Sequence, residues 1–221
     1  LLRVVPAAVK RSPDAAPKAL TILREAVAPT QAFEVRGRAV MALGALGPLG
    51  VPMLAEVRTG ADEPVLRHLA ARELAGVGSA DARGALRAAL ADGDPRVRET
   101  AAEGLGRLRD VDASAALIAG AKQEPWPFVR RAELEALGRL CGAGAADLLV
   151  RGVERDVAEV RRAALVSLSR CKDPRAQPLL LRVLGRRNEA STMRALAAAL
   201  LGEMGDRTAA RAMAAALGRQ I

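Results

Sequence analysis

The chain has 221 residues, of which 51% are hydrophobic and 27% charged, and its formal net charge is +9. This composition excludes an intrinsically disordered chain. No apolar run approaches the roughly 20 residues that a membrane-spanning helix needs. Ala and Leu supply most of the apolar content, and aromatic residues make up only 1%. Because strand-forming residues are scarce, an all-α fold is predicted.

Arginines recur along the chain at nearly constant intervals of 31, 31, 32, 31 and 33 residues. The six are Arg36, Arg67, Arg98, Arg130, Arg161 and Arg194. A small residue follows each of them eight positions later: Gly44, Ala75, Gly106, Gly138, Ser169 and Gly202. A period of this length is typical of stacked repeats rather than of one globular core. We expect the small residues to let the second helix of the unit, or the next unit, approach closely.

In chain order, each period contains two amphipathic helices joined by a short turn. First helices are expected near residues 33–46, 64–77, 94–108, 128–140, 159–170 and 192–204. Second helices are expected near residues 14–27, 48–57, 79–90, 113–123, 145–154, 174–184 and 207–217. The sequence thus predicts one array of about seven units, the first entered within its first helix. The units are 1–29, 30–61, 62–91, 92–123, 124–155, 156–187 and 188–221.

An acidic residue lies five or six positions before five of the six arginines. These residues are Asp62, Asp92, Glu124, Asp156 and Glu189. Placed at the turn between units, such carboxylates accept hydrogen bonds from helix N-termini and from an arginine of the same or a neighbouring unit. We expect a ladder of ion pairs along the array, with a structural role.

The repeat also carries a recognisable pattern in the fourth unit. It consists of Asp92, Pro95, Val97, Arg98, Ala101, Ala102, Leu105 and Gly106. This pattern resembles the HEAT-like repeats first associated with phycobilisome lyases, and the resemblance covers essentially the whole chain. It implies a right-handed α-solenoid whose first helices form the convex face and whose second helices line the concave face. It says little about function, because such repeats serve scaffolds, adaptors, regulators and a few enzymes.

Cysteine and histidine offer no metal site. Cys141 and Cys171 lie just past the ends of helices in adjacent units. Neighbouring helix axes are about 8–10 Å apart, whereas disulfide-bonded cysteines have Cα atoms about 4.4–6.8 Å apart, so two free thiols are expected. The single histidine, His68, has no neighbouring Cys ligands and is expected to be a packed or exposed helix residue. No cofactor is predicted.

Three enzymatic classes share this repeat, and none matches well. The HEAT-like deoxyhypusine hydroxylases need paired His-Glu motifs, which are missing. The bilin lyases share the repeat, but no active residue can be identified. The HEAT-like alkylpurine DNA glycosylases use several aromatic residues and a catalytic Asp, whereas here only Trp126 is present and Arg130 stands four residues on. A non-enzymatic protein is therefore expected.

Basic residues concentrate on the second helices, and their density rises towards the C-terminus. Residues 155–187 hold nine basic residues against three acidic ones. The candidate partner-binding residues are Arg83, Arg87, Arg151, Arg155, Arg182, Arg186 and Arg187, with Lys122, Arg175, Arg207 and Arg211 on the same helices or at their ends. Such a stripe suits an acidic protein surface or a phosphate backbone, although an ordinary solvated face is the competing interpretation.

The aromatic residues allow two interpretations as well. Trp126 and Phe128 flank Pro127 at the start of one first helix, and Phe33 has a comparable place in another unit. They either fill gaps between adjacent units or, if Trp126 is exposed, supply an anchor for a protein partner.

The sequence predicts a non-catalytic scaffold or adaptor that binds an acidic protein partner, or another region of its parent chain, through the concave face. The alternative is nucleic-acid binding through the C-terminal basic stripe. The weakest alternative is an enzyme resembling the bilin lyases or the DNA glycosylases. A cytoplasmic location is the default expectation. Because no Met stands at position 1, we expect the chain to begin inside a larger or processed protein.

Overall fold

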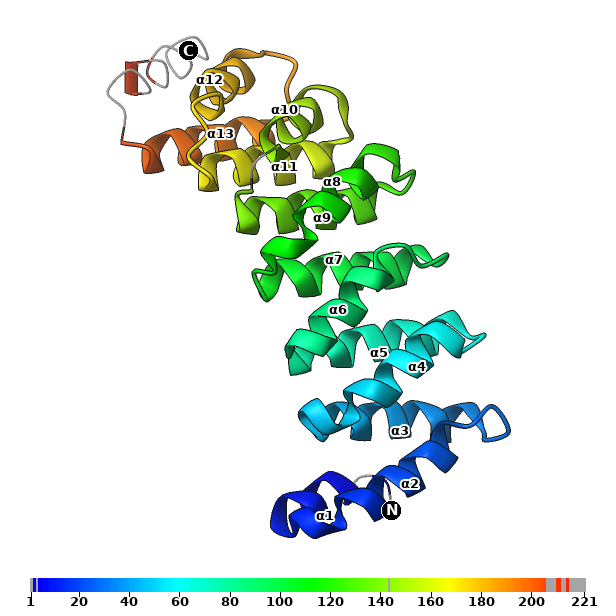
Figure 1. The fold of residues 1–221 in the computed structure, drawn as a ribbon. Coiled ribbons are helices and arrows are strands. Elements are labelled where there is room, and N and C mark those ends of the chain that lie inside the picture. Colours follow the sequence, from blue (N-terminus) through cyan, green and yellow to red (C-terminus); the bar gives the residue numbers. More distant parts are fainter. Residues whose placement is uncertain (1, 3, 143, 206–209, 212–213, 215–221) are drawn as a thin grey trace.

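The computed structural model describes residues 2, 4–142, 144–205, 210, 211 and 214. Within these residues the chain forms thirteen α-helices and no strand (Figure 1). The first helices of the pairs are α1 (Val5–Arg11), α3 (Phe33–Ala45), α5 (Pro64–Val77), α7 (Pro95–Arg107), α9 (Pro127–Leu140), α11 (Ala158–Arg170) and α13 (Ser191–Glu203). The second helices are α2 (Ala16–Val27), α4 (Val51–Gly60), α6 (Ala80–Ala89), α8 (Ser114–Gln123), α10 (Ala145–Arg155) and α12 (Ala176–Gly185).

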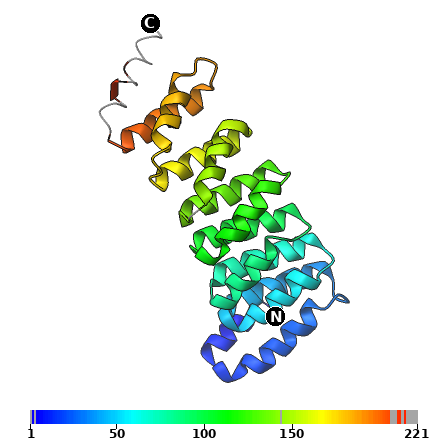
Figure 2. The ribbon, with the colours of Figure 1, turned by 45° about the horizontal axis from the view of Figure 1, so that its top comes forward.

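This arrangement confirms the predicted all-α array of helix pairs. The odd-numbered helices stack on one another along the array, and each even-numbered helix packs beside them as a second layer (Figure 1). Figure 2 shows the pairs following one another from the N-terminus towards the C-terminus along an elongated body. The predicted boundaries between units stay a prediction. The helix expected at 207–217, with Arg207, lies largely outside the described residues.

Local sequence explains where the helices begin and end. Proline occupies the first helical position of α5, α7 and α9, where its missing N–H costs no hydrogen bond. The Asp94 carboxylate caps α7 by accepting a hydrogen bond from the Arg96 N–H at 2.8 Å. Helix α5 ends at Gly78 with a φ of 65°, a left-handed conformation that glycine adopts without steric penalty.

The core runs between the two layers and contains Leu, Ala and Val rather than aromatic rings. Its largest fully buried side chains are leucines from both layers, among them Leu43, Leu54, Leu105, Leu117 and Leu137. Because a buried Leu contributes about 1.5–3 kcal/mol relative to exposure, each unit depends on the leucines that its neighbours cover.

Glycines, which have no side chain, allow neighbouring first helices to lie close together. A Cβ atom added at Gly106 would lie 2.8 Å from the Cα atom of Ala136 on α9. A Cβ atom added at Gly138 would lie 2.8 Å from the Cα atom of Ser167 on α11. The small residues therefore face the first helix of the next unit. At Gly202, by contrast, nothing among the described residues lies within 4 Å of an added Cβ atom.

Gly106→Leu is expected to lower the free energy of unfolding by about 1–3 kcal/mol, because the side chain would have to displace α9. Urea denaturation followed by circular dichroism measures this. The matched control is Gly76→Ala, since an added Cβ atom at Gly76 in α5 meets nothing within 4 Å. The control is expected to be neutral or to gain about 0.5–1 kcal/mol. Equal stability of Gly106→Leu and the parent would contradict the close-packing account.

Candidate protein-binding surface

The recurring arginines occupy the same place in every unit. Each is the fourth residue of a first helix, and five of them form an ion pair with a carboxylate that follows the second helix of the same unit. The pairs are Arg36 with Glu63 (2.6 Å), Arg67 with Asp92 (3.0 Å), Arg98 with Glu124 (2.8 Å), Arg130 with Asp156 (2.7 Å) and Arg161 with Glu189 (2.5 Å). The sixth arginine, Arg194, donates a hydrogen bond to the carbonyl of Leu184.

The first pair differs from the sequence prediction. Arg36 contacts Glu63 rather than Asp62, and Asp62 accepts a hydrogen bond from Arg67 only through its backbone carbonyl, at 3.2 Å. The acid here is Glu63, the residue directly before α5, and it lies four positions before the next arginine rather than five or six. The sequence prediction assumed a spacing of five or six residues and therefore missed Glu63.

Four of the five paired arginines, all except Arg36, also donate to backbone carbonyls at the end of the unit before. Arg98 donates from Nη1 to the carbonyl of Asp92, at 2.8 Å, and Arg130 donates in the same way to the carbonyl of Glu124, at 2.6 Å. These carbonyls follow the ends of second helices, where backbone acceptors lack helical partners. Glu124 in turn accepts a hydrogen bond from the backbone N–H of Trp126, at 3.1 Å. Each such guanidinium thus binds the turn before its own helix pair and the carboxylate after that pair. The carboxylate in turn binds the start of the next first helix.

The electrostatics follow from these bonds. Burial opposes ionisation of Asp92 and Glu124, but hydrogen bonds from the arginines and from backbone N–H groups outweigh it. The pKa of each carboxyl therefore lies below its ordinary value. For Glu189, the hydrogen bond from Arg161 is the largest influence, and it lowers the pKa. These carboxylates are ionised and occupied near neutral pH, so they are poor candidates for binding a ligand.

A buried acid that the sequence reasoning missed lies behind the ladder. Glu133 on α9 is 1% exposed, faces Gly120 of α8, and has no hydrogen-bond partner for Oε2. Burial, reinforced by the nearby Glu124 carboxylate, raises its pKa to about 8 although Arg98 and Arg130 oppose this. A comparison of the repeats in the sequence could have revealed Glu133. Three positions after the other recurring arginines stands a buried alanine: Ala39, Ala70, Ala101, Ala164 and Ala197.

The predicted basic stripe divides into paired and unpaired cations. Arg87 forms ion pairs with Asp110 and Asp112, at 3.3 and 3.0 Å. Arg182 pairs with Glu154 at 3.1 Å, and Arg83 donates to the carbonyl of Gly78. Arg175 pairs with Asp147 at 2.6 Å and with Asp173 at 2.9 Å. Four other predicted cations form no ion pair among the described residues. They are Arg151, Arg155, Arg186 and Arg187, and Lys122 shares this property. We call these five residues the basic patch.

Part of the basic patch surrounds a hollow between α8 and α10. The hollow has a volume of about 490 Å³, and Lys122, Arg151 and Arg155 line it. The carboxylates of Glu124 and Asp156 also reach it, but each is already bound to a ladder arginine. Because the acids are neutralised and the three cations are not, the hollow favours an anionic group.

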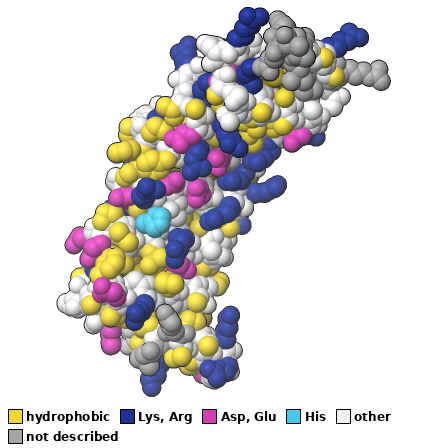
Figure 3. Space-filling model, turned by 180° about the vertical axis from the view of Figure 1, so that it is seen from behind, with side chains coloured by type: hydrophobic (Ala, Val, Ile, Leu, Met, Phe, Trp, Pro, Cys, Tyr) yellow, Lys and Arg dark blue, Asp and Glu magenta, His cyan; other side chains and the backbone are white. Residues whose placement is uncertain are grey.

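The opposite face has a different character. Figure 3, seen from behind, shows acidic and basic side chains mixed over much of this surface. Arg131 of α9 illustrates the mixing, because it contacts Glu99 of α7 at 3.2 Å and Glu135 of its own helix at 3.1 Å. Charges that already form ion pairs in this way are less available to a binding partner.

The aromatic residues form an exposed corner at the start of α9. Trp126 is 50% exposed, and its ring centroid lies 5.9 Å from that of Phe128. The guanidinium of Arg96 lies over the Phe128 ring, 4.8 Å from its centroid, which is a cation–π arrangement. Phe33 is also exposed. Trp126 does not fill a gap between units, so it remains a candidate anchor for a partner.

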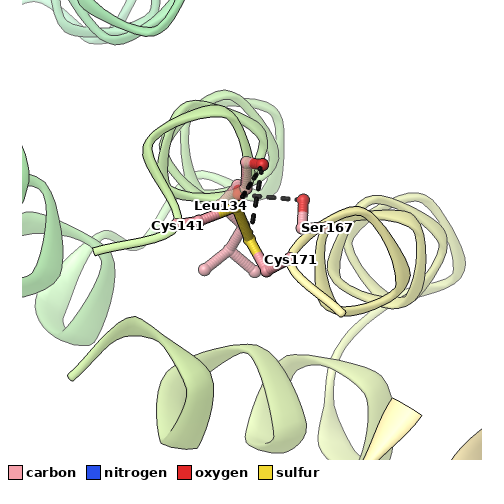
Figure 4. Close-up of a disulfide and its surroundings, with 5 residues drawn as sticks. Leu134, Cys141, Ser167 and Cys171 are labelled. Atoms are coloured by element: carbon pink, nitrogen blue, oxygen red, sulfur yellow. Dashed lines mark hydrogen bonds between the residues drawn. A yellow bond between two sulfur atoms is a disulfide. The ribbon is translucent and has the colours of Figure 1, made fainter. Parts of the chain in front are cut away.

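The expectation of two free thiols is wrong. Cys141 and Cys171 form a disulfide, with Cα atoms 5.3 Å apart (Figure 4). The distance between helix axes misled the sequence argument, because both cysteines follow the ends of α9 and α11 on facing sides. The contact of Gly138 with Ser167 brings these helices close together. The expectation of a cytoplasmic location stays a prediction.

The remaining chemistry is sparse. His68 is a packed helix residue whose Nδ1 lies 3.1 Å from Oγ1 of Thr100 on α7. In the part of the chain that the structure describes, no group of three or more His, Cys, Asp or Glu side chains could hold a metal ion. No helix in that part is long and apolar enough to cross a membrane.

Comparison with known proteins agrees with this geometry. The family described as HEAT repeats matches residues 51–138, and the PBS lyase HEAT-like repeat matches residues 160–186. The chain thus contains HEAT-like repeats within residues 51–138 and 160–186. This confirms the resemblance drawn from the arginine-centred pattern. No protein of curated function matches the chain in sequence.

Two solved structures with TM-scores above 0.5 share the fold. A chain of the complex of CpcE and CpcF of phycocyanin lyase from Nostoc sp. PCC7120 is 28% identical, with a TM-score of 0.57 over 86% of this chain and 79% of that one. An engineered protein is 20% identical, with a TM-score of 0.57 over 98% of this chain and 66% of that one. Human deoxyhypusine hydroxylase is 21% identical, with a TM-score of 0.48 over 92% and 91%.

Arg98→Ala is expected to lower the free energy of unfolding by about 2–4 kcal/mol, because it leaves Glu124 buried without its partner. Arg24→Ala is the control, since the Arg24–Glu56 pair is exposed and is worth at most about 1 kcal/mol. Thermal and urea unfolding measure both. The pKa of Glu124 is lowered on folding, so the pair stabilises above the ordinary pKa and loses this effect on acidification. A difference between Arg98→Ala and the parent that persists unchanged at pH 3 would contradict the assignment.

Glu133→Gln tests the buried acid. The pKa of Glu133 rises from 4.5 to about 8 on folding, so the unfolded chain releases its proton first as pH increases. The parent should therefore lose stability between pH 5 and pH 8, at about 1.4 kcal/mol for each unit of pKa difference at most. The Gln variant should lack this loss, and urea denaturation across the pH range measures it. Parallel stability curves for the two proteins would refute a neutral Glu133.

Proposed function

We propose that this protein is a non-catalytic scaffold or adaptor that binds an acidic region of a partner protein through the face formed by its second helices. The HEAT-like resemblance implies that this face is the concave side of the solenoid. The observation that carries the proposal is the division of the arginines. The ladder arginines are bound to carboxylates, whereas the basic patch has no ion pair among the described residues.

Two features support a protein partner over a nucleic acid. Two carboxylates stand beside the patch cations Arg151 and Arg155 on α10, and each is held by a single exposed ion pair, Asp147 with Arg175 and Glu154 with Arg182. Duplex DNA carries one charge for about every 1.7 Å of its axis, so its backbone would meet these acids repeatedly. An acidic protein surface presents separate carboxylates and avoids them. The half-exposed Trp126 adds a residue type that is enriched in protein-binding hot spots.

The similar structure from Nostoc supports the same class of function. It contains CpcE and CpcF in a complex, so a chain with this fold is found there with a protein partner. The HEAT-like fold itself favours binding over catalysis. The extended surface of such an array supplies contact area, and unpaired arginines steer acidic partners to it.

An affinity capture tests the proposal. The bait pair consists of the parent chain and the variant Arg151→Glu/Arg155→Glu/Arg187→Glu. The control is Lys10→Glu/Lys18→Glu/Arg38→Glu, which changes the net charge equally at exposed cations outside the patch. Lysates with and without nuclease are read by quantitative mass spectrometry.

We expect one dominant protein partner that survives nuclease and falls at least tenfold with the patch variant but not with the control. Loss with nuclease would favour the nucleic-acid alternative. Equal loss with both triple variants would show that total charge, not the patch, controls binding.

A further inference from the structure

Arg58, in the last turn of α4, is a buried arginine whose charge has no partner. The residue is only 9% exposed, and its Nε atom has no hydrogen-bond partner. Within the described residues Arg58 makes no hydrogen bond or ion pair at all, and burial lowers its pKa. A guanidinium carries five donors, and leaving it unpaired away from water costs more than an apolar residue would.

The repeat shows that this position does not require an arginine. Arg58 is the third residue from the end of its helix, and the same position holds Ala121 in α8, Val153 in α10 and Val183 in α12, all buried. In α6 the position holds Arg87, but Arg87 pairs with two aspartates that follow α7. The corresponding turn after α5 is Gly78-Ser79, which has no carboxylate to offer Arg58.

The nearest acid on the array is already occupied. Asp92 influences Arg58 electrostatically, yet its oxygens accept hydrogen bonds from Arg67 at 3.0 and 3.1 Å and from the Asp94 N–H at 2.9 Å. Asp62 is exposed and lines the same surface hollow as Arg58. The charge of Arg58 is therefore not matched by a bound carboxylate.

Open space lies beside the Arg58 side chain. A hollow of about 450 Å³ is lined by Arg58 and by small residues from the ends of α4 and α6. Two of these, Gly60 and Gly93, have nothing within 4 Å of an added Cβ atom. The hollow has the same place relative to the ladder as the one beside Arg151, since Arg67 and Asp92 border the first and Arg130 and Asp156 the second.

We propose that this hollow is a binding site for a carboxylate side chain of the partner protein, which Arg58 receives with its planar guanidinium. The proposal rests on the proposed function in that the occupant belongs to a protein partner. A carboxylate fits the guanidinium fork with two parallel hydrogen bonds. Phosphate fits the same fork, but its higher charge would be repelled more strongly by Asp62 and Asp92. The two hollows are two units apart, about 20 Å at ordinary helix spacing, so one extended acidic segment of about six residues spans both.

The first test uses nuclear magnetic resonance on the full chain labelled with ¹⁵N-arginine. Sodium acetate, inorganic phosphate and sodium chloride are titrated separately at equal ionic strength, and Arg58→Lys assigns the Nε–H signal. We expect acetate to shift the Arg58 signal saturably, at least threefold more than phosphate or chloride, while the exposed Arg38 stays constant. Equal shifts with all three salts would show screening only and would overturn the proposal.

The second test separates this site from the basic patch. Arg58→Leu should raise the melting temperature, because an apolar residue replaces an unpaired buried charge, and it should weaken capture of the partner at least tenfold. Arg38→Leu removes one exposed charge as the control. If Arg58→Leu retains the partner while the patch variant loses it, the carboxylate site is refuted and the proposed function stands. If neither variant loses the partner, both proposals fail.

Discussion

The array depends on a recurring guanidinium that joins consecutive units, as Arg67, Arg98, Arg130 and Arg161 show. The recurring arginine donates to carbonyls left free at the end of one second helix and to a carboxylate that follows the next. That carboxylate also accepts a hydrogen bond from a backbone N–H group where the following first helix begins. The bonds supply what the ends of short helices lack, and the glycines opposite Ala136 and Ser167 let the helices come close enough to share them.

This constraint also decides which charges are available to a partner. Acids at the turns are used by the ladder, and acids on the outer face are used by residues such as Arg131. What remains is a set of cations on or just after the second helices for which the array offers no acid. Four of them border two hollows of similar position: Lys122, Arg151 and Arg155 line one, and Arg58 lines the other. The net charge of +9 is therefore less informative than its distribution. Unpaired positive charge on one face is the property that a partner would recognise.

The sequence predicted the fold well, because helix pairs repeat with a constant period and each repeat restates the same pattern. It predicted the ladder acids wherever they kept their spacing and missed Glu63, which stands one position closer to the next arginine than the Asp62 that the spacing selected. It could not predict the disulfide, because that depends on how closely two helix ends approach rather than on the distance between axes. Glu133 and Arg58 were overlooked for the opposite reason. Glu133 stands where the other units have a buried alanine, and Arg58 where α8, α10 and α12 have a buried alanine or valine, so aligning the repeats by position reveals both.

The ladder is tested most directly by a double-mutant cycle between Arg130 and Asp156. Arg130→Gln, Asp156→Asn and the double variant are compared with the parent by urea denaturation in dilute salt at pH 7. If the arginine bonds join the units, the two substitutions are strongly coupled, by at least about 1.5 kcal/mol, since charged hydrogen bonds contribute about 1.5–3 kcal/mol. Additive effects, with a coupling below about 0.3 kcal/mol, would show that the helices are held by apolar packing alone and would contradict this account.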